Sequence, residues 1–371
     1  MGGYLLTIQT SILIFPVLAC IITMPYVIWM YRKYGSINFI KTVIIYSFVL
    51  YLESCFLLVN LPLPNPGSVH NNYIDMINLI PFKFIGDFIR ESPLRIFNIS
   101  TYLSAVKHGT FFVPAFNILM LIPFGIYLRY YFKFSLKKTI LSTALLSLFF
   151  ELVQLSGLFF IYKGPYRLCD IDDIIQNTLG GILGYLIAGL LCKILPTREE
   201  IDNRAIEKGK KVPGIRKVIA FLIDVFLIKV ISLIIRIFVP LDSIFVFILY
   251  FTILPRKTGN TLGTKFLKFH LEMENRNYLK LLIRSLGMIT YIYVFPRFVI
   301  HMMNKVNENI NTLDLAAVFF IVFMIFVIYI IVTIYTILAN RSWPFDKIFN
   351  MTYVSDIKPV DQKDIERKDK E

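Results

Sequence analysis

Charged residues are scarce in this sequence. Asp, Glu, Lys and Arg make up 17% of its 371 residues, hydrophobic residues make up 56%, and the mean hydropathy is +0.66. A water-soluble domain usually has about 25% charged residues, so this composition excludes that class of protein. The sequence predicts an all-α, polytopic integral membrane protein whose main partner is the lipid bilayer.

Cysteine and histidine are also rare, with four of each. The cysteines form no CxxC or Cys/His spacing, so the pattern indicates neither a disulfide framework nor a cysteine metal site. No GxSxG or HExxH motif supports hydrolysis. The stretch GNTLGTK, residues 259–265, lacks the spacing of a nucleotide-binding loop. We therefore expect no cofactor, and catalysis would have to rest on carboxylates.

The formal net charge is nevertheless +14. The run EKGKKVPGIRK, residues 207–217, is the only candidate nucleic-acid patch, and it has no aromatic residues that would stack on bases. Lys and Arg in cytoplasmic loops explain the same charge through the positive-inside rule. We therefore expect no nucleic-acid partner.

Long apolar runs predict the membrane topology, because a spanning helix needs about 20 mostly apolar residues. The first run has no basic start and no small-residue cleavage site, so we expect it to remain as a span. Basic residues alternate between successive loops, which predicts an N-terminus outside and a C-terminus in the cytoplasm. About nine spans are predicted, near residues 4–30, 40–61, 110–128, 139–161, 173–195, 217–239, 241–255, 280–298 and 313–339.

Composition also divides the chain into modules. The most polar interior stretch, residues 196–213, reads as a cytoplasmic linker between two membrane modules. The predicted division is an N-terminal transmembrane segment at 1–39, a membrane domain at 40–195, the linker, a second membrane domain at 214–355 and a charged cytoplasmic tail at 356–371.

Polar residues gather around the stretch CDIDDIIQNTLGGILGY, residues 169–185, where three aspartates precede a helix with a stripe of small residues. Small residues let a partner helix approach closely. The expected partner is the preceding span, which is joined by one short loop and has polar residues on one face. We expect these side chains to meet near the outer surface: Asp170, Asp172, Asp173, Glu151, Gln154, Asn177 and Asn117.

Two interpretations of this cluster remain open. The carboxylates and amides could join helices and cap a helix N-terminus, where the macrodipole favours negative charge. Alternatively they could form an outward-facing pocket for a cation, a lipid headgroup or a positively charged ligand. Three close carboxylates repel one another, and a cap needs only one. Arg167 could balance one aspartate, which weakens the case for a metal site. Whether the carboxylates bind a metal stays open.

Two further carboxylates lie within predicted spans, where ionisable groups are costly. Glu53 is expected to pair with a buried polar group. Asp224 could form an ion pair with Lys229, Arg236 or another helix, or it could belong to an ion or proton path.

Residues 40–195 resemble a VanZ-like domain. The resemblance rests on NLIPF (Asn78 to Phe82), NILMLIPFG (Asn117 to Gly125), FFELVQL (Phe149 to Leu155) and DIDDIIQNTLGGILGY (Asp170 to Tyr185). It implies a bacterial cytoplasmic-membrane protein associated with resistance to teicoplanin-type glycopeptide antibiotics.

Residues 212–355 resemble an RDD domain, a family named for one Arg and two Asp. The matching residues are Arg216 and Asp224 in RKVIAFLID, the stretch GNTLGTKFLKFHL, and Asp346 in RSWPFDKIFN. The resemblance implies no agreed activity, although transport, including sodium/proton antiport, has been proposed for some members.

Three functions are therefore considered. The leading hypothesis is binding of an envelope component, such as a lipid-linked molecule or a lipoglycopeptide, at the outer leaflet without covalent chemistry. The second is ion- or proton-coupled transport through intramembrane carboxylates. The third is an intramembrane enzyme acting on a lipid-linked substrate, which the lack of a recognised nucleophile disfavours.

Overall fold

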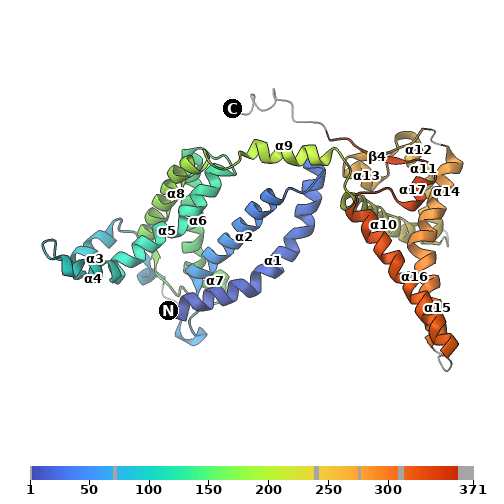
Figure 1. Ribbon diagram of the computed structural model, residues 1–371. Coiled ribbons are helices and arrows are strands. Elements are labelled where there is room, and N and C mark those ends of the chain that lie inside the picture. Colours follow the sequence, from blue (N-terminus) through green and yellow to red (C-terminus); the bar gives the residue numbers. More distant parts are fainter. Residues whose placement is uncertain (1, 70–72, 238–241, 275–276, 308–312, 358–371) are drawn as a thin grey trace. The chain divides into compact units, whose positions relative to one another are not determined.

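The computed structural model describes residues 2–69, 73–237, 242–274, 277–307 and 313–357. Helices dominate these residues, and eight of them are long and apolar enough to cross a membrane, which confirms the predicted all-α polytopic fold (Figure 1). The candidate spans are Leu5–Tyr34, Phe39–Asn60, Gly109–Tyr130, Leu136–Leu155, Ile171–Leu191, Gly214–Arg236, Tyr278–Lys305 and Ala317–Leu338.

The span predicted at 241–255 is the exception. Its described part forms α11, Ser243–Ile253, which has 11 residues and is followed by the short α12, Pro255–Thr258. At 1.5 Å per residue α11 is about 16 Å long, whereas the hydrocarbon core of a bilayer is about 30 Å thick. Among the residues that the structure describes, eight helices rather than about nine are long enough to span a membrane. Most of the predicted charged tail, residues 358–371, lies outside the described residues.

The chain divides into two compact units. Unit 1 comprises Met1–Ile21 and Phe39–Ile201, and unit 2 comprises Ile22–Asn38 and Asp202–Glu371. The first helix, α1 (Gly2–Tyr34), contributes to both units. The predicted linker contains α9, Arg198–Gly209, and the division between the units falls within this helix.

In unit 1 three helices, α5, α6 and α8, lie side by side (Figure 1). Short helices α3 and α4 contact the N-terminal part of α5, where the rings of Phe88 and Phe111 are 5.9 Å apart. A parallel pair of two-residue strands, β1 and β2, joins the segment before α3 to the start of α8. The elements that follow α1 are α2 Phe39–Asn60, η1 Pro66–Ser68, η2 Ile74–Met76, β1 Ile77–Asn78, α3 Lys83–Glu91, η3 Ile99–Thr101, α4 Tyr102–Lys107, α5 Gly109–Tyr130, α6 Leu136–Leu155, α7 Gly157–Phe160, β2 Cys169–Asp170 and α8 Ile171–Leu191.

Glycine allows α5 and α8 to touch through their backbones. A Cβ atom on Gly180 would lie 2.1 Å from the carbonyl oxygen of Ile118, and one on Gly184 would lie 2.0 Å from that of Ile122. No side chain fits at such distances, so the small residues of α8 permit a close helix crossing. At these two positions the partner is α5, whereas the sequence predicted the preceding span, α6, which also contacts α8. The crossing fixes the N-terminal halves of α5 and α8 relative to each other.

Unit 2 combines helices with a two-stranded antiparallel sheet. Strand β3 pairs with β4 from the end of the described chain, and Lys211 adds a bridge to Val354. Helices α14 and α15 are joined by a π-helical turn, η4. The elements after α9 are α10 Gly214–Arg236, α11, α12, α13 Leu262–Phe266, β3 Phe269–Glu272, α14 Tyr278–Ile289, η4 Thr290–Val294, α15 Phe295–Asn307, α16 Leu313–Leu338, α17 Pro344–Lys347 and β4 Thr352–Ser355.

Candidate functional site

The start of α8 is fixed by the first aspartate of the cluster. Asp170 is the N-cap of α8, and its Oδ1 accepts the backbone N–H of Asp172 at 2.9 Å. The same oxygen accepts the side-chain amide of Asn78 at 2.9 Å, next to the β1–β2 pair. An N-cap carboxylate stabilises a helix by satisfying a free N–H group. Asp170 therefore has a structural role.

Asp172 binds the same segment, at the start of α3. Its carboxylate accepts the backbone N–H groups of Phe82 at 2.5 Å and Phe84 at 3.0 Å, and it is only 3% exposed. These groups lie at the start of α3, where Phe82 has a left-handed backbone with φ of 62°. Asp172 thus supplies from a distance the cap that α3 lacks locally.

Asp173 points elsewhere. Its Oδ1 accepts the side-chain amide of Asn117 on α5 at 2.7 Å, and the same amide donates to Gln176 at 2.9 Å. On α6, Ser147 accepts the amide of Asn177 at 2.8 Å. The side-chain Oδ1 of Asn177 is buried and accepts no hydrogen bond among the described residues. This polar layer therefore joins α5, α6 and α8 while leaving an acceptor unsatisfied.

Glu151 on α6 is 2% exposed and contacts the segment before α8. Its Oε2 accepts the backbone N–H of Asp170 at 2.9 Å. Burial, together with the negative charges of Glu151 and Asp170, raises the pKa of the adjacent Cys169 thiol to about 11. Cys169 is therefore a protonated thiol at neutral pH and a poor nucleophile.

Glu151, Asp173 and Asn177 line a cavity of about 230 Å³ in unit 1, which we call the acidic cavity. It has polar groups on one part of its wall and apolar side chains from α2 and α5 on the rest. Its lining residues are Leu58, Val59, Phe112, Val113, Phe116, Asn117, Met120, Phe150, Glu151, Gln154, Arg167, Asp173 and Asn177.

The one cationic residue of this wall, Arg167, does not neutralise the carboxylates. Its Nη2 donates to the carbonyl oxygen of Leu61 at 2.8 Å, and no ion pair joins it to Glu151 or Asp173. Gln154 likewise donates to a carbonyl of α2, that of Val59, at 2.8 Å. Among the described residues, no group of three or more His, Cys, Asp or Glu side chains is arranged to hold a metal ion.

The structure thus divides the set of residues that the sequence singled out. Five of the seven line the acidic cavity: Asn117, Glu151, Gln154, Asp173 and Asn177. Asp170 and Asp172 do not, because their oxygens bind Asn78 and Phe82 in the segment before α3. Arg167 was considered only as a counter-charge, and Gln176 was missed, although it lies on α8 three residues after Asp173 and one helical turn away.

In unit 2, which the family match reported below does not reach, the three residues on which the RDD resemblance rested have separate partners. Arg216 is fully buried and donates to backbone carbonyls of Leu267 and Lys268, each at 2.7 Å from Nη2, and to the Ser355 hydroxyl at 3.0 Å. Arg216 therefore joins α10 to the residues just before β3 and to the last residue of β4. Asp346 forms a buried ion pair, 2.6 Å, with Arg284 on α14. Arg284 is a partner that the sequence analysis did not identify.

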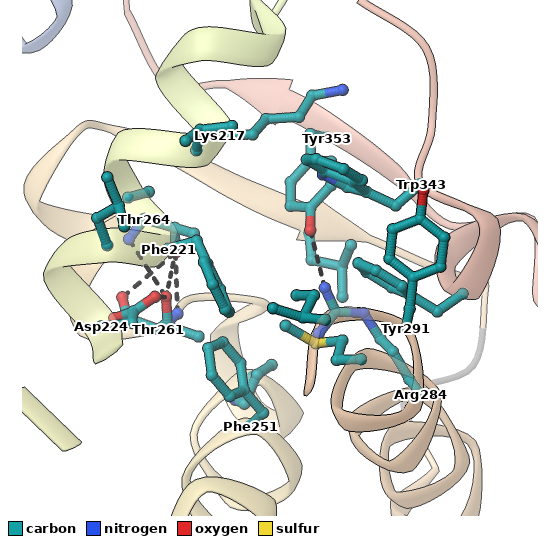
Figure 2. Close-up of a pocket in the computed structure, with 18 of the residues that line it drawn as sticks. Lys217, Phe221, Asp224, Phe251, Thr261, Thr264, Arg284, Tyr291, Trp343 and Tyr353 are labelled. Carbon is teal, nitrogen blue, oxygen red and sulfur yellow. Dashed lines mark hydrogen bonds between the residues drawn. The ribbon is translucent and has the colours of Figure 1, made fainter. Parts of the chain in front are cut away.

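Asp224 forms no ion pair with Lys229 or Arg236, contrary to one of the sequence hypotheses. Its carboxylate accepts the hydroxyl of Thr261 at 2.5 Å (Figure 2). It also accepts the hydroxyl of Tyr250 at 2.5 Å and the backbone N–H of Gly263 at 2.6 Å. Three donors satisfy a buried carboxylate without a cation. This arrangement favours a structural role for Asp224 in holding α11 and α13 against α10.

Glu53 on α2 differs from every other carboxylate described here. Both of its oxygens are buried, and neither accepts a hydrogen bond among the described residues. The expected pairing with a buried polar group is therefore absent from the described part of the chain.

The comparisons with known proteins bear on unit 1. A family model described as VanZ/LLP1 matches residues 48–192, the region that contains every residue of the acidic cavity. Residues 48–192 are therefore a VanZ-like membrane domain. No curated protein and no solved structure matches the chain significantly.

Proposed function

We propose that the acidic cavity binds an envelope component or a lipoglycopeptide at the outer leaflet of a bacterial cytoplasmic membrane, and thereby lowers susceptibility to teicoplanin-type glycopeptides. In this proposal the N-terminus is outside and the C-terminus is cytoplasmic. The match of residues 48–192 supports a membrane protein of the VanZ-like type, which is linked to glycopeptide resistance in general.

One observation carries the proposal. Glu151 and Asp173 line one cavity without an ion pair, while Asn177 presents a buried, unsatisfied acceptor beside them. Ionisable groups in a membrane span are costly, so their retention without a countercharge favours a ligand that supplies cationic or hydrogen-bond donor groups. The apolar wall from α2 and α5 suits a lipid chain or an acylated group of the same ligand.

The mechanism is binding without covalent chemistry. The Cys169 thiol interacts with Glu151, and its raised pKa leaves almost no thiolate at neutral pH. Sequestering the antibiotic, or the lipid-linked precursor that it recognises, would reduce the contact between the two.

The test is teicoplanin susceptibility in a sensitive Gram-positive host. Strains would express the wild type, Asp173→Asn or Glu151→Gln at matched membrane levels, with the exposed Glu91→Gln as the matched control. We expect resistance in the wild type and the control, and its loss in both cavity variants. Equal resistance in all four strains would refute the proposed role of the cavity.

Ion- or proton-coupled transport is a second candidate, and Glu53 is the observation that favours it. A buried carboxyl group without a partner in a span is suited to exchange a proton or to await a cation. This candidate predicts proton or sodium flux in reconstituted vesicles that Glu53→Gln abolishes. Transport through Glu53 would be excluded if neither a proton nor a sodium gradient drove flux, or if the flux were unchanged in Glu53→Gln.

A further inference from the structure

Unit 2 encloses a cavity of about 270 Å³ that none of the roles above uses (Figure 2). We call it the aromatic cavity. It lies among α10, α11, α14 and α16 and the segment after α16, and its wall includes Phe221, Phe251, Tyr291, Trp343 and Phe345. Its volume is nearly twice the roughly 150 Å³ of an apolar engineered cavity that binds benzene. The space therefore suits an apolar group.

The charges in this wall are largely satisfied within the protein. Asp224 accepts three hydrogen bonds, and Arg284 donates from Nε to Asp346 at 2.6 Å and from Nη2 to the Tyr353 hydroxyl at 2.8 Å. A ligand therefore gains little from pairing with these groups. The interior favours hydrocarbon.

Lys217 is different. It is 8% exposed and lines the cavity near the start of α10, and its ammonium donates to the carbonyl oxygen of Arg341 at 3.2 Å. It forms no ion pair with a described carboxylate, and it lies over the ring of Tyr353 at 5.2 Å. One end of the cavity therefore has a cationic side chain that forms no ion pair among the described residues.

The cavity also extends to the apolar surface of the spans. At the start of α10, Gly214 lies so close to α16 that an added Cβ would be 2.0 Å from the carbonyl oxygen of Ile337. Beyond this contact, Leu222 of α10 and Tyr329 of α16 line the cavity, and Leu222 is 51% exposed. A chain can thus enter between the two helices from the bilayer.

We propose that the aromatic cavity binds one hydrocarbon chain of an anionic lipid, with the lipid headgroup at Lys217. The apolar wall accepts the chain, the exposed rim at Leu222 gives it access from the bilayer, and Lys217 lies at the end of the span where headgroups are found. Charge complementarity selects an anionic headgroup over a neutral one.

Tryptophan fluorescence can test this directly, because the chain has two tryptophans, Trp29 and Trp343, and Trp343 lines the cavity. The full-length Trp29→Phe protein in detergent micelles would be titrated with phosphatidylglycerol brominated on its chains. We expect saturable quenching of Trp343, competed by unbrominated phosphatidylglycerol and at least several-fold weaker with brominated phosphatidylcholine. The Trp343→Phe protein, which retains Trp29, measures quenching by bulk lipid.

Variants connect the signal to the cavity. Val218→Phe or Leu222→Phe narrows it and should abolish saturable quenching, whereas Val230→Phe on the exposed face of α10 should leave quenching unchanged. Lys217→Met should remove the preference for the anionic lipid. Thermal unfolding of each variant confirms that it is folded. Equal quenching of Trp29 and Trp343, or no effect of both narrowing variants, would overturn the proposal.

Discussion

The carboxylate of Asp172 accepts the backbone N–H of Phe82 at 2.5 Å, across 90 residues of chain. Asp173, its neighbour in sequence, contacts Asn117 and lines the acidic cavity instead. Successive residues in the first turn of a helix point about 100° apart, so two adjacent carboxylates serve different purposes. A substitution at one is therefore not equivalent to a substitution at the other.

We predict that Asp172→Asn and Asp173→Asn have opposite phenotypes. The amide at position 172 would present an N–H₂ group to one of two backbone donors, so the free energy of unfolding should fall by about 1–3 kcal/mol. The amide at position 173 can still accept from Asn117, so the fold should remain while a negative charge is lost. Thermal unfolding in detergent and teicoplanin susceptibility would be measured for both.

The expected pattern is lower stability and lower membrane abundance for Asp172→Asn, and normal stability without resistance for Asp173→Asn. Asp87→Asn, a carboxylate on α3 outside both contacts, is the control for the loss of one negative charge. Equal stability of the two variants would contradict the structural role of Asp172.

The division of the aspartate cluster shows what the sequence could predict about the site. Periodicity placed Glu151 and Gln154 on one face of α6 and Asn177 on the facing side of α8, and all three line the cavity. Periodicity within a helix gives no information on a distant loop. The partners of Asp170 and Asp172 lie in residues 78–84, so their structural role became apparent only from the fold.

The fold itself was largely predictable, because hydropathy identifies spans that must satisfy their own backbone hydrogen bonds. The prediction from hydropathy failed for α11, because an apolar run of that length is equally compatible with a short buried helix. The Arg284–Asp346 pair was not predictable for another reason. Its members are 62 residues apart, and nothing in either local sequence identifies the other.

Gly184→Ala should disrupt the acidic cavity from a distance. The new methyl group would lie 2.0 Å from the carbonyl oxygen of Ile122, so α5 and α8 must separate and the Asn117–Asp173 hydrogen bond should lengthen or break. Overpacking of this kind costs about 1–3 kcal/mol, measurable as a lower midpoint of thermal unfolding together with reduced resistance. Gly109→Ala on α5, which meets no atom within 4 Å, is the matched control. A stable, fully active Gly184→Ala variant would contradict this contact.

Cys169 reports the charge of the acidic cavity. Burial and its anionic neighbours raise the pKa of the thiol to about 11, and only the thiolate reacts with alkylating reagents. In a variant with Cys20, Cys55 and Cys192 replaced by Ala, the alkylation rate should rise about tenfold per pH unit from pH 7 to 9.5 without a plateau, whereas a thiol of ordinary pKa near 8.5 would level off.

Removing a negative neighbour lowers a thiol pKa, so Glu151→Gln should increase the alkylation rate of Cys169 at pH 8. Glu91→Gln, at an exposed position of α3, should leave the rate unchanged. Mass spectrometry of the modified protein at timed intervals gives the rates. An unchanged rate in Glu151→Gln would show that Glu151 exerts no negative field on this thiol.

The Arg284–Asp346 pair should behave as a coupled buried unit, because its side chains are 4% and 0% exposed. Arg284→Met leaves the Asp346 carboxylate buried without its cation and should destabilise unit 2 by about 3–5 kcal/mol. Arg284→Met combined with Asp346→Leu removes both charges and should recover most of that loss, since buried ion pairs contribute little beyond an apolar pair of similar size.

Thermal unfolding in detergent measures the stability of both variants. The control is Asp356→Asn, which removes the more exposed contact with His270 and should cost less than about 1 kcal/mol. If the double variant were no more stable than Arg284→Met, the two charges would not be coupled, and the loss would have to be assigned to the packing of Arg284 against Phe345.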